Sequence, residues 1–171
     1  SPLYSNVDAV AGAEFVNGGD WITRTGSAGA GVLQLDIEGQ LYDVDGKGNI
    51  KPNWVDLTIE ARIVGASAWT LLSSSTLTNS STDVLRRTLS FDVVPGQYEV
   101  RAKLGVPRWN DGGSADACKF SWVSLKSVQA DTTDYSQWGR IGIKIRASGQ
   151  LSGSLDQVRA TYRAKPMPIW T

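Results

Sequence analysis

Two runs of alternating apolar and polar residues, joined by Pro95 and Gly96, constrain the fold of this chain more than any other feature. The first run extends over residues 85–93 and the second over residues 98–104. An alternation with a period of two places one set of side chains in a core and the other set in water. Two such runs separated by Pro-Gly predict consecutive antiparallel β-strands.

The connection between the two runs has the pattern Pro-Gly-x-Tyr-x-Val, in which Tyr98 begins the second run. This pattern resembles the tyrosine corner of immunoglobulin-like sandwiches, where the Tyr hydroxyl hydrogen-bonds to backbone a few residues upstream. An ordinary hairpin with an inward-facing Tyr is the alternative. In either arrangement the alternation predicts one shared core, made up of Leu35, Trp54, Leu57, Ile59, Leu89, Phe91, Tyr98, Val100 and Trp122.

Similar patterns predict the remaining strands. They lie at residues 21–25, 32–41, 54–64, 69–72 and 118–128, the last of these with a bulge. The Ser- and Thr-rich stretch at 73–83 predicts a loop that leads into the central pair of strands. Composition supports this assignment, because Ser, Thr, Gly, Val and Trp favour short strands and turns. We therefore expect an all-β sandwich.

The chain divides into three expected parts. Residues 1–16 are a lead-in with an edge strand around residues 7–10, residues 17–130 form the sandwich, and residues 131–171 form a C-terminal extension. Strands expected at 141–147 and 158–164 pair like a hairpin and pack on the sandwich or on a parent domain. A helix is the alternative for residues 156–165. The chain begins at Ser1 and not at Met, so we expect a segment of a longer protein.

Charge and composition exclude several partners. The sequence has 17 Lys and Arg residues against 17 Asp and Glu residues, so no net basic field attracts nucleic acid or an anionic membrane. No apolar run approaches membrane-spanning length, and no signal peptide is visible. Cys118 is the only cysteine, which leaves no intrachain disulfide.

The residue types also predict that the chain is not an enzyme. Histidine is absent, which removes the commonest general base and the commonest metal ligand. Carboxylate pairs such as Asp43 with Asp45 and Asp131 with Asp134 raise the question of glycoside hydrolysis. On hairpin loops such pairs are mostly solvated turn residues, so we expect no catalytic residue and no cofactor.

The stretch 43–53 has a pattern that is similar to a calcium loop, because Asp43, Asp45 and Asn49 surround Gly46. A calcium loop also needs a bidentate Glu at its twelfth position, and no Glu falls there when counting from either Asp. Lys47 lies inside the loop as well. We therefore expect an ordinary hairpin loop and no metal site.

Exposed tryptophans offer a different function, since a sandwich can bind glycans by stacking sugars on aromatic rings. The candidate residues for such an interaction surface are Trp109, Trp138 and Trp21, and Trp109 lies between turn residues. Two or more aromatic rings lying coplanar on one exposed face would favour glycan binding. An apolar patch with a charged rim would favour a contact between subunits.

The order of the strands in residues 20–129 resembles a fibronectin type III sandwich. A more specific resemblance is to the tail-tip host-specificity protein J family of lambda-like phages and prophages. Four stretches carry it: NGGDWITRT at 17–25, GQLYDVDGKGNIKPNWVDLTIEARIVGASAWTLL at 39–72, LRRTLSFDVVPGQYEVRAKL at 85–104, and RIGIKIRASGQLSGSLDQVRATYRAKPMPIW at 140–170. The last stretch is the most characteristic, because a phrase ending in QLSG recurs in that family.

The resemblance implies a structural part of the virion tail tip, made in the cytoplasm of the bacterial host. Its partners would be other tail-tip proteins and copies of itself, arranged as a trimer in the full-length protein. Contact with a host receptor or glycan would be concentrated in the far C-terminal part of the full-length protein. This chain resembles an earlier, internal segment, so its expected contribution to host attachment is indirect.

Overall fold

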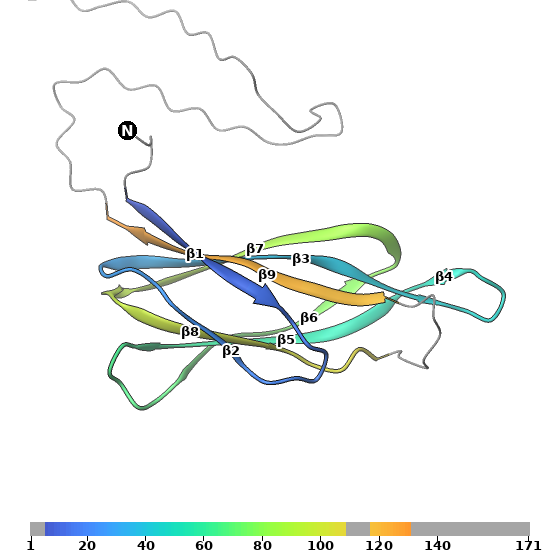
Figure 1. Cartoon of the computed structure of the whole chain (residues 1–171), viewed down its shortest axis with the longest axis horizontal. Helices are drawn as coiled ribbons and strands as arrows, with labels where there is room; N and C mark the ends of the chain where they lie inside the picture. Colours follow the sequence, from blue (N-terminus) through green and yellow to red (C-terminus); the bar gives the residue numbers. More distant parts are fainter. Residues whose placement is uncertain (1–5, 109–116, 131–171) are drawn as a thin grey trace, which may run out of the picture. The chain divides into compact units, whose positions relative to one another are not determined.

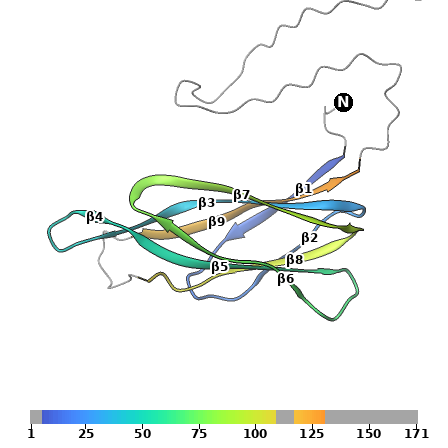
Figure 2. The same cartoon turned by 180° about the vertical axis from the view of Figure 1, so that it is seen from behind.

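The computed structural model describes residues 6–108 and 117–130, which form two antiparallel β-sheets in two layers (Figure 1, Figure 2). Sheet A has the strand order β1-β9-β3-β4, and β7 also pairs with β3; sheet B has the order β2-β8-β5-β6. The strands are β1 (Val7–Glu14), β2 (Ile22–Thr25), β3 (Ala30–Val44), β4 (Ile50–Lys51), β5 (Asn53–Ile63), β6 (Thr70–Asn79), β7 (Ser81–Gly96), β8 (Tyr98–Leu104) and β9 (Ala117–Gln129). Within these residues, no helix is long and apolar enough to cross a membrane.

The predicted all-β sandwich is confirmed, and its core lies between the two sheets. Alternate residues of the central strands are buried, as the period-two pattern requires. Of the predicted core residues, Leu35, Leu57, Ile59, Tyr98, Val100 and Trp122 are buried, whereas Leu89 and Phe91 are half-buried against the core. The half-burial has a simple cause, because β7 lies at the edge of sheet A and its inner face is open on one side. The C-terminal extension predicted at 131–171 lies outside the described residues.

The prediction that Trp54 belongs to the core was wrong. Val55, Leu57 and Ile59 set the inward phase of β5, so Trp54 falls on the outer face of sheet B and is half-buried there. Asn53 takes the inward position instead and is fully buried. Its side-chain oxygen accepts a hydrogen bond of 2.8 Å from the backbone N–H of Trp54.

The joint at Pro95 and Gly96 is a tyrosine corner and not a hairpin. Strand β7 pairs with β3 in sheet A, whereas β8 pairs with β2 and β5 in sheet B, so the two consecutive strands belong to different layers. The Tyr98 hydroxyl donates a hydrogen bond of 2.7 Å to the carbonyl oxygen of Val94. That bond satisfies a buried hydroxyl and fixes the path of the chain as it crosses from one sheet to the other.

The prediction of a loop at 73–83 was also wrong, because most of that stretch is strand. Strand β6 extends to Asn79 at the edge of sheet B, and β7 begins at Ser81 in sheet A. The only apolar residue in 73–83 is Leu77, which is buried, so an apolar alternation is missing there. Ser and Thr suit an edge strand whose outer face is in water.

Strand β9 carries the predicted bulge. Its pairing with β3 changes register between Asp36 and Ile37, which lie opposite Ser124 and Trp122. Val123 is the extra residue, and its side chain is exposed. The bulge reverses the phase of the strand, so that Trp122 and Leu125 both face the core although they are an odd number of residues apart.

The two ends of the described sandwich lie side by side. The N-terminal segment, expected as a lead-in, contributes the edge strand β1, and its residue Val7 pairs with Val128 near the end of β9 (Figure 1). The backbone N–H of Gln129 donates to the carbonyl of Asn6 at 2.8 Å, and the Asn6 side chain donates to the carbonyl of Gln129 at 2.8 Å. The chain therefore enters and leaves this sandwich at one place.

The tyrosine corner generates the first prediction. Replacing Tyr98 by Phe removes the hydrogen bond to Val94 but keeps the ring, so the free energy of unfolding should fall by about 0.5–1.5 kcal/mol. Urea unfolding followed by fluorescence measures this change. The matched control is Tyr42→Phe, because no hydroxyl hydrogen bond of Tyr42 is found among the described residues. An equal loss in both variants would contradict the role of the corner.

Candidate interaction surface

Outward-facing residues of β5 and β8 form a charged row on the outer face of sheet B. The strand register places Glu60 opposite Arg101 and Arg62 opposite Glu99. The Arg62 Nε donates to a Glu99 carboxylate oxygen at 2.6 Å, and the Arg101 Nε donates to a Glu60 carboxylate oxygen at 2.7 Å. Because all four side chains are partly buried, these ion pairs are screened less than fully exposed ones.

Two tryptophans outside the strands stack on these cations. The guanidinium carbon of Arg101 lies 4.3 Å from the ring centroid of Trp21 and 4.2 Å from that of Trp69. The guanidinium carbon of Arg62 also lies 4.4 Å from the Trp69 centroid, and the Lys103 ammonium lies 4.7 Å from the Trp21 centroid. Together Trp21, Arg62, Trp69, Arg101 and Lys103 form what we call the Trp–Arg stack. Each of its contacts lies within cation–π range.

The Trp–Arg stack changes the interpretation of Trp21. A sugar-binding tryptophan must present a free ring face to solvent. Two cations, Arg101 and Lys103, already lie over the Trp21 ring. Since Arg101 lies over Trp21 and Trp69 alike, the two rings turn their faces toward that side chain. Trp109 and Trp138, the other predicted interaction residues, lie outside the described residues.

Trp69 was missed as a surface residue by the sequence analysis, which placed it in a short strand of its own. In the structure Trp69 lies in the connection between β5 and β6, directly before β6, and its ring packs against Arg62 and Arg101 of the charged row. A signal was present, because Arg62, Arg101 and Lys103 occupy outward positions of strands with a clear alternation. The sequence does not give the register that brings them to the same tryptophan.

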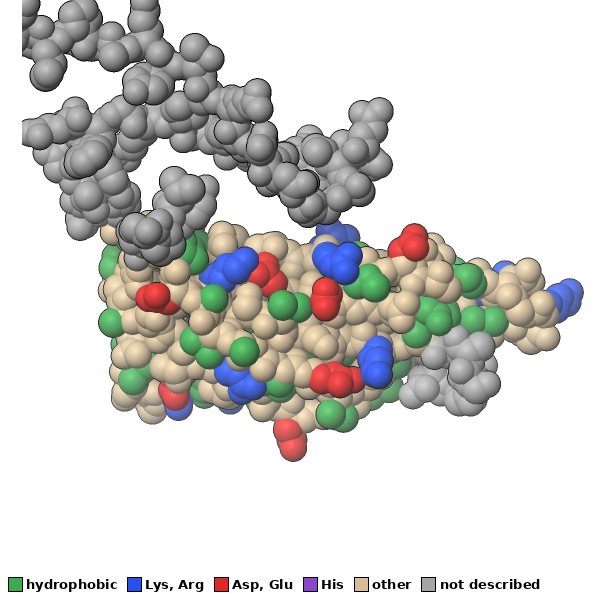
Figure 3. Space-filling view, turned by 45° about the horizontal axis from the view of Figure 1, so that its top comes forward, with side chains coloured by type: hydrophobic (Ala, Val, Ile, Leu, Met, Phe, Trp, Pro, Cys, Tyr) green, Lys and Arg blue, Asp and Glu red, His purple; other side chains and the backbone are tan. Residues whose placement is uncertain are grey.

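The outer face of sheet A is polar and mixed in charge. Hydrophobic side chains lie there in small separate groups among acidic and basic ones (Figure 3). At its centre, Asp36 accepts hydrogen bonds from Thr88 at 2.6 Å and Ser124 at 2.9 Å, and its carboxylate lies 2.6 Å from the Lys126 ammonium. Partial burial alone would raise the pKa of Asp36, but these three partners outweigh it and the pKa is lowered.

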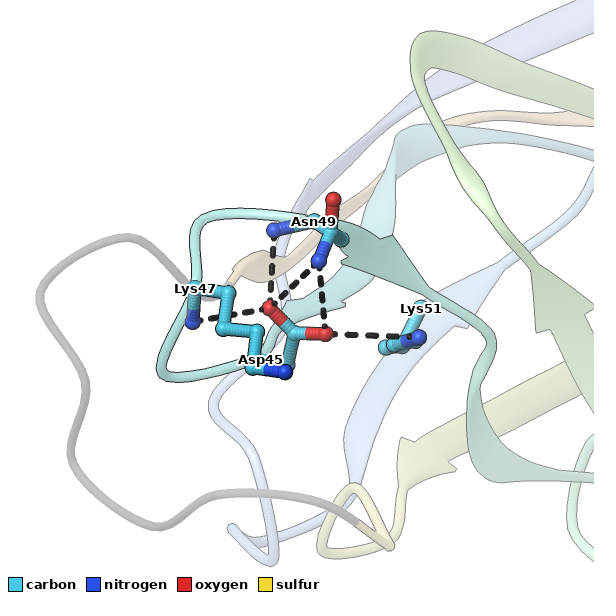
Figure 4. Close-up of polar contacts among 4 residues, drawn as sticks. All are labelled: Asp45, Lys47, Asn49 and Lys51. Atoms are coloured by element: carbon cyan, nitrogen blue, oxygen red, sulfur yellow. Dashed lines mark hydrogen bonds and ion pairs between the residues drawn. The ribbon is translucent and has the colours of Figure 1, made fainter.

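The loop between β3 and β4 is organised by one carboxylate (Figure 4). Asp45 accepts hydrogen bonds from the backbone N–H groups of Lys47 at 3.0 Å and Asn49 at 2.9 Å, and its second oxygen lies 3.3 Å from the Lys51 ammonium. Hydrogen bonds from Asn49 are the main reason why the pKa of Asp45 is well below its usual range. Both oxygens therefore already have partners within the hairpin loop.

The described part of the chain has no metal cluster, and its one cysteine is not activated. Among these residues, no group of three or more Cys, Asp, Glu or His side chains could hold a metal ion. Burial raises the pKa of the Cys118 thiol to about 11, although a hydrogen bond to Asn17 acts in the opposite direction. At neutral pH this thiol is protonated and is a poor nucleophile.

The Trp–Arg stack generates the second prediction. Replacing Arg101 by Met keeps an unbranched side chain but removes the charge that contacts Trp21, Trp69 and Glu60. The free energy of unfolding in urea should fall by roughly 1–3 kcal/mol. The control is Arg86→Met, which breaks an exposed pair with Glu38 and should cost less than about 1 kcal/mol. The stack would be unimportant for stability if the two variants unfolded alike.

Comparison with known proteins places these features in a family. The family model described as "Tip attachment protein J, FNIII-A domain" matches residues 6–131. No curated protein matches the chain. A solved structure titled "CBM4 structure and function" aligns with this chain at 11% sequence identity and a TM-score of 0.38. The alignment covers 73% of this chain and 72% of that structure's chain. At that TM-score the likeness carries no argument about fold or function.

The family match agrees with the resemblance to protein J found in the sequence, and it takes in well over half of the chain. It also agrees with the two-layer sandwich and its tyrosine corner. The chain therefore belongs to the family of the FNIII-A domain of tip attachment protein J, a component of the phage tail tip.

Proposed function

We propose that this chain is a non-enzymatic structural module that helps to assemble the phage tail tip and serves host attachment indirectly. Its partners would be other tail-tip proteins and further copies of the same chain, as a trimer in the full-length protein. The proposed place of synthesis is the cytoplasm of the bacterial host. Family membership supports the tail-tip role. The observation that carries the proposal further is the junction of the two ends of the sandwich.

That junction brings the two ends of the sandwich together. The reciprocal hydrogen bonds between Asn6 and Gln129 join the residue before β1 to the last residue of β9. The Gln129 side chain adds hydrogen bonds to the Asp8 carboxylate at 2.9 Å and to the Ala28 carbonyl at 3.2 Å. A domain whose ends adjoin can be set into a longer chain without separating the flanking parts.

The surface also supports a structural role. Its outward-facing charges are largely used within the molecule, as in the pairs Glu60 with Arg101 and Asp36 with Lys126. The serious alternative is a carbohydrate-binding module that uses exposed tryptophans. Because Trp21 already stacks with Arg101 and Lys103, the other candidates for that alternative are Trp109 and Trp138. Titration of the chain with host cell-wall glycans, followed by tryptophan fluorescence, would reveal such binding.

The proposed domain boundary gives the third prediction. A chain truncated after Gln129 should remain folded and melt at nearly the temperature of the full chain, because residues 6–129 already contain the described core. Circular dichroism during a thermal ramp measures this. An unfolded truncated chain would show that residues 131–171 belong to the sandwich, and the proposed boundary would then be wrong.

The fourth prediction tests the function in the virion. Residues 7–128 are replaced in the phage protein by a short Gly-Ser bridge, which the adjoining ends allow. We expect fewer complete tails in electron micrographs, while those that form still adsorb to host cells. The control phage carries Glu14→Gln, which removes only an exposed pair with Lys119 and should leave the fold intact. Normal tail assembly combined with lost adsorption would instead assign direct receptor binding to this domain.

A further inference from the structure

Among residues 6–108 and 117–130, no strand pairs with the outer edge of β7, which forms one long edge of sheet A. We propose that a second copy of this chain binds there by adding its own β7 antiparallel to the first, so that sheet A continues across two copies. Only β3 pairs with β7 in the described structure, and the register of that pair is regular from Leu85 to Asp92. A regular edge strand presents unpaired N–H and C=O groups that can pair with another strand.

The opposite edge of sheet A, formed by β1, is covered by a side chain. There the Arg24 guanidinium donates to the backbone carbonyls of Ala11 at 2.8 Å and Gly12 at 2.9 Å on β1. Such a side chain occupies the groups that a partner strand would need. No comparable bond from a described side chain reaches the backbone of residues 84–93. The β7 edge is therefore the more accessible of the two.

The residues of β7 are complementary to themselves when two copies pair around Leu89. On the outer face, Arg86 of each copy lies opposite Asp92 of the other, and Thr88 lies opposite Ser90. Asp92 has no ion pair among the described residues, and the pair of Arg86 with Glu38 is exposed enough to rearrange. Opposite charges directly across an antiparallel pair stabilise it, and the two-fold symmetry makes two such pairs.

The inner face fits the same register. Leu85 lies opposite Val93, Arg87 lies opposite Phe91, and Leu89 meets its own copy. Except for the exposed Arg87, these side chains are only half-buried in one copy. A hollow of about 300 Å³ between β6 and β7 is lined in part by Leu85, Arg87 and Leu89. Side chains of the second β7 would enter it and bury apolar surface that one copy leaves open.

Charge selects this register over its neighbours. A shift of two residues in one direction places Arg86 opposite Ser90, and a shift in the other direction places it opposite Val94. Both shifts lose the two ion pairs, and a shift of one residue puts inward side chains on the outer face. A two-fold contact of this kind joins two copies and then closes, so it differs from the contacts of the proposed trimer.

The fifth prediction tests the pairing with charges. Sedimentation velocity of the full 171-residue chain over a concentration series should show a weak dimer. Asp92→Arg places like charges opposite each other twice and should weaken the dimer about tenfold. The charge swap that combines Arg86→Asp with Asp92→Arg should restore it. Glu14→Arg, on the opposite edge of sheet A, makes the same change in net charge and should have no effect.

A cysteine cross-link tests the register directly. In a Cys118→Ser background, Leu89→Cys brings two thiols together across the two-fold axis and should give a disulfide-linked dimer under mild oxidation. Leu85→Cys is the matched control, because its two copies would lie about 27 Å apart along the strands. The proposal is overturned if the chain stays monomeric at every concentration, if the charge swap does not restore the dimer, or if both cysteines cross-link equally.

Discussion

Strand β3 is the element on which sheet A depends, because it pairs with β4, β7 and β9. Its inward residues Leu33, Leu35 and Ile37 are buried and contribute to the core against sheet B. Strands β7 and β9 come from distant parts of the chain, so their pairing with β3 must overcome a large loss of chain entropy. Burial of apolar side chains at alternate positions supplies the free energy that offsets it.

The same constraint explains the bulge in β9. Without it, Trp122 and Leu125 would point to opposite faces, and one large apolar side chain would lie in water. The extra residue, Val123, restores the inward phase at the cost of one exposed valine. The tyrosine corner at Tyr98 has a comparable role between β7 and β8. It lets the chain pass from sheet A to sheet B while the Tyr98 ring stays in the core.

The fold could be predicted from the sequence wherever one face of a strand is apolar and the other polar. Strands β5 and β8 are of this kind, and their residues Leu57, Ile59, Tyr98 and Val100 are buried as predicted. Trp54 was predicted in the core because its side chain is large and apolar, although the inward positions Val55 and Leu57 place it on the outer face. Asn53 is buried but polar, so nothing in the alternation of apolar residues indicated its burial. The strand content of 73–83 was missed because an edge strand needs few apolar residues.

The candidate surface was less predictable, because it depends on contacts between strands. Arg62, Trp69 and Arg101 meet only once the register of β5 against β8 is known, and no local pattern fixes that register. Trp21 was recognised as a surface residue, but its ring is stacked against Arg101 and Lys103. An aromatic residue in a loop of a sandwich can therefore make contacts within its own domain and need not bind a partner.

The Trp–Arg stack and the β7 edge differ in what they offer a partner. In the stack, Arg62 and Arg101 already have carboxylate and aromatic neighbours, so a partner would have to displace them before gaining new contacts. At the β7 edge, Asp92 has no ion-pair partner among the described residues, and Arg86 has only an exposed pair with Glu38 to give up. No described strand pairs with the outer edge of β7. The binding free energy contains only what new contacts gain beyond the contacts that must be given up. Association is therefore favoured at the β7 edge over the Trp–Arg stack.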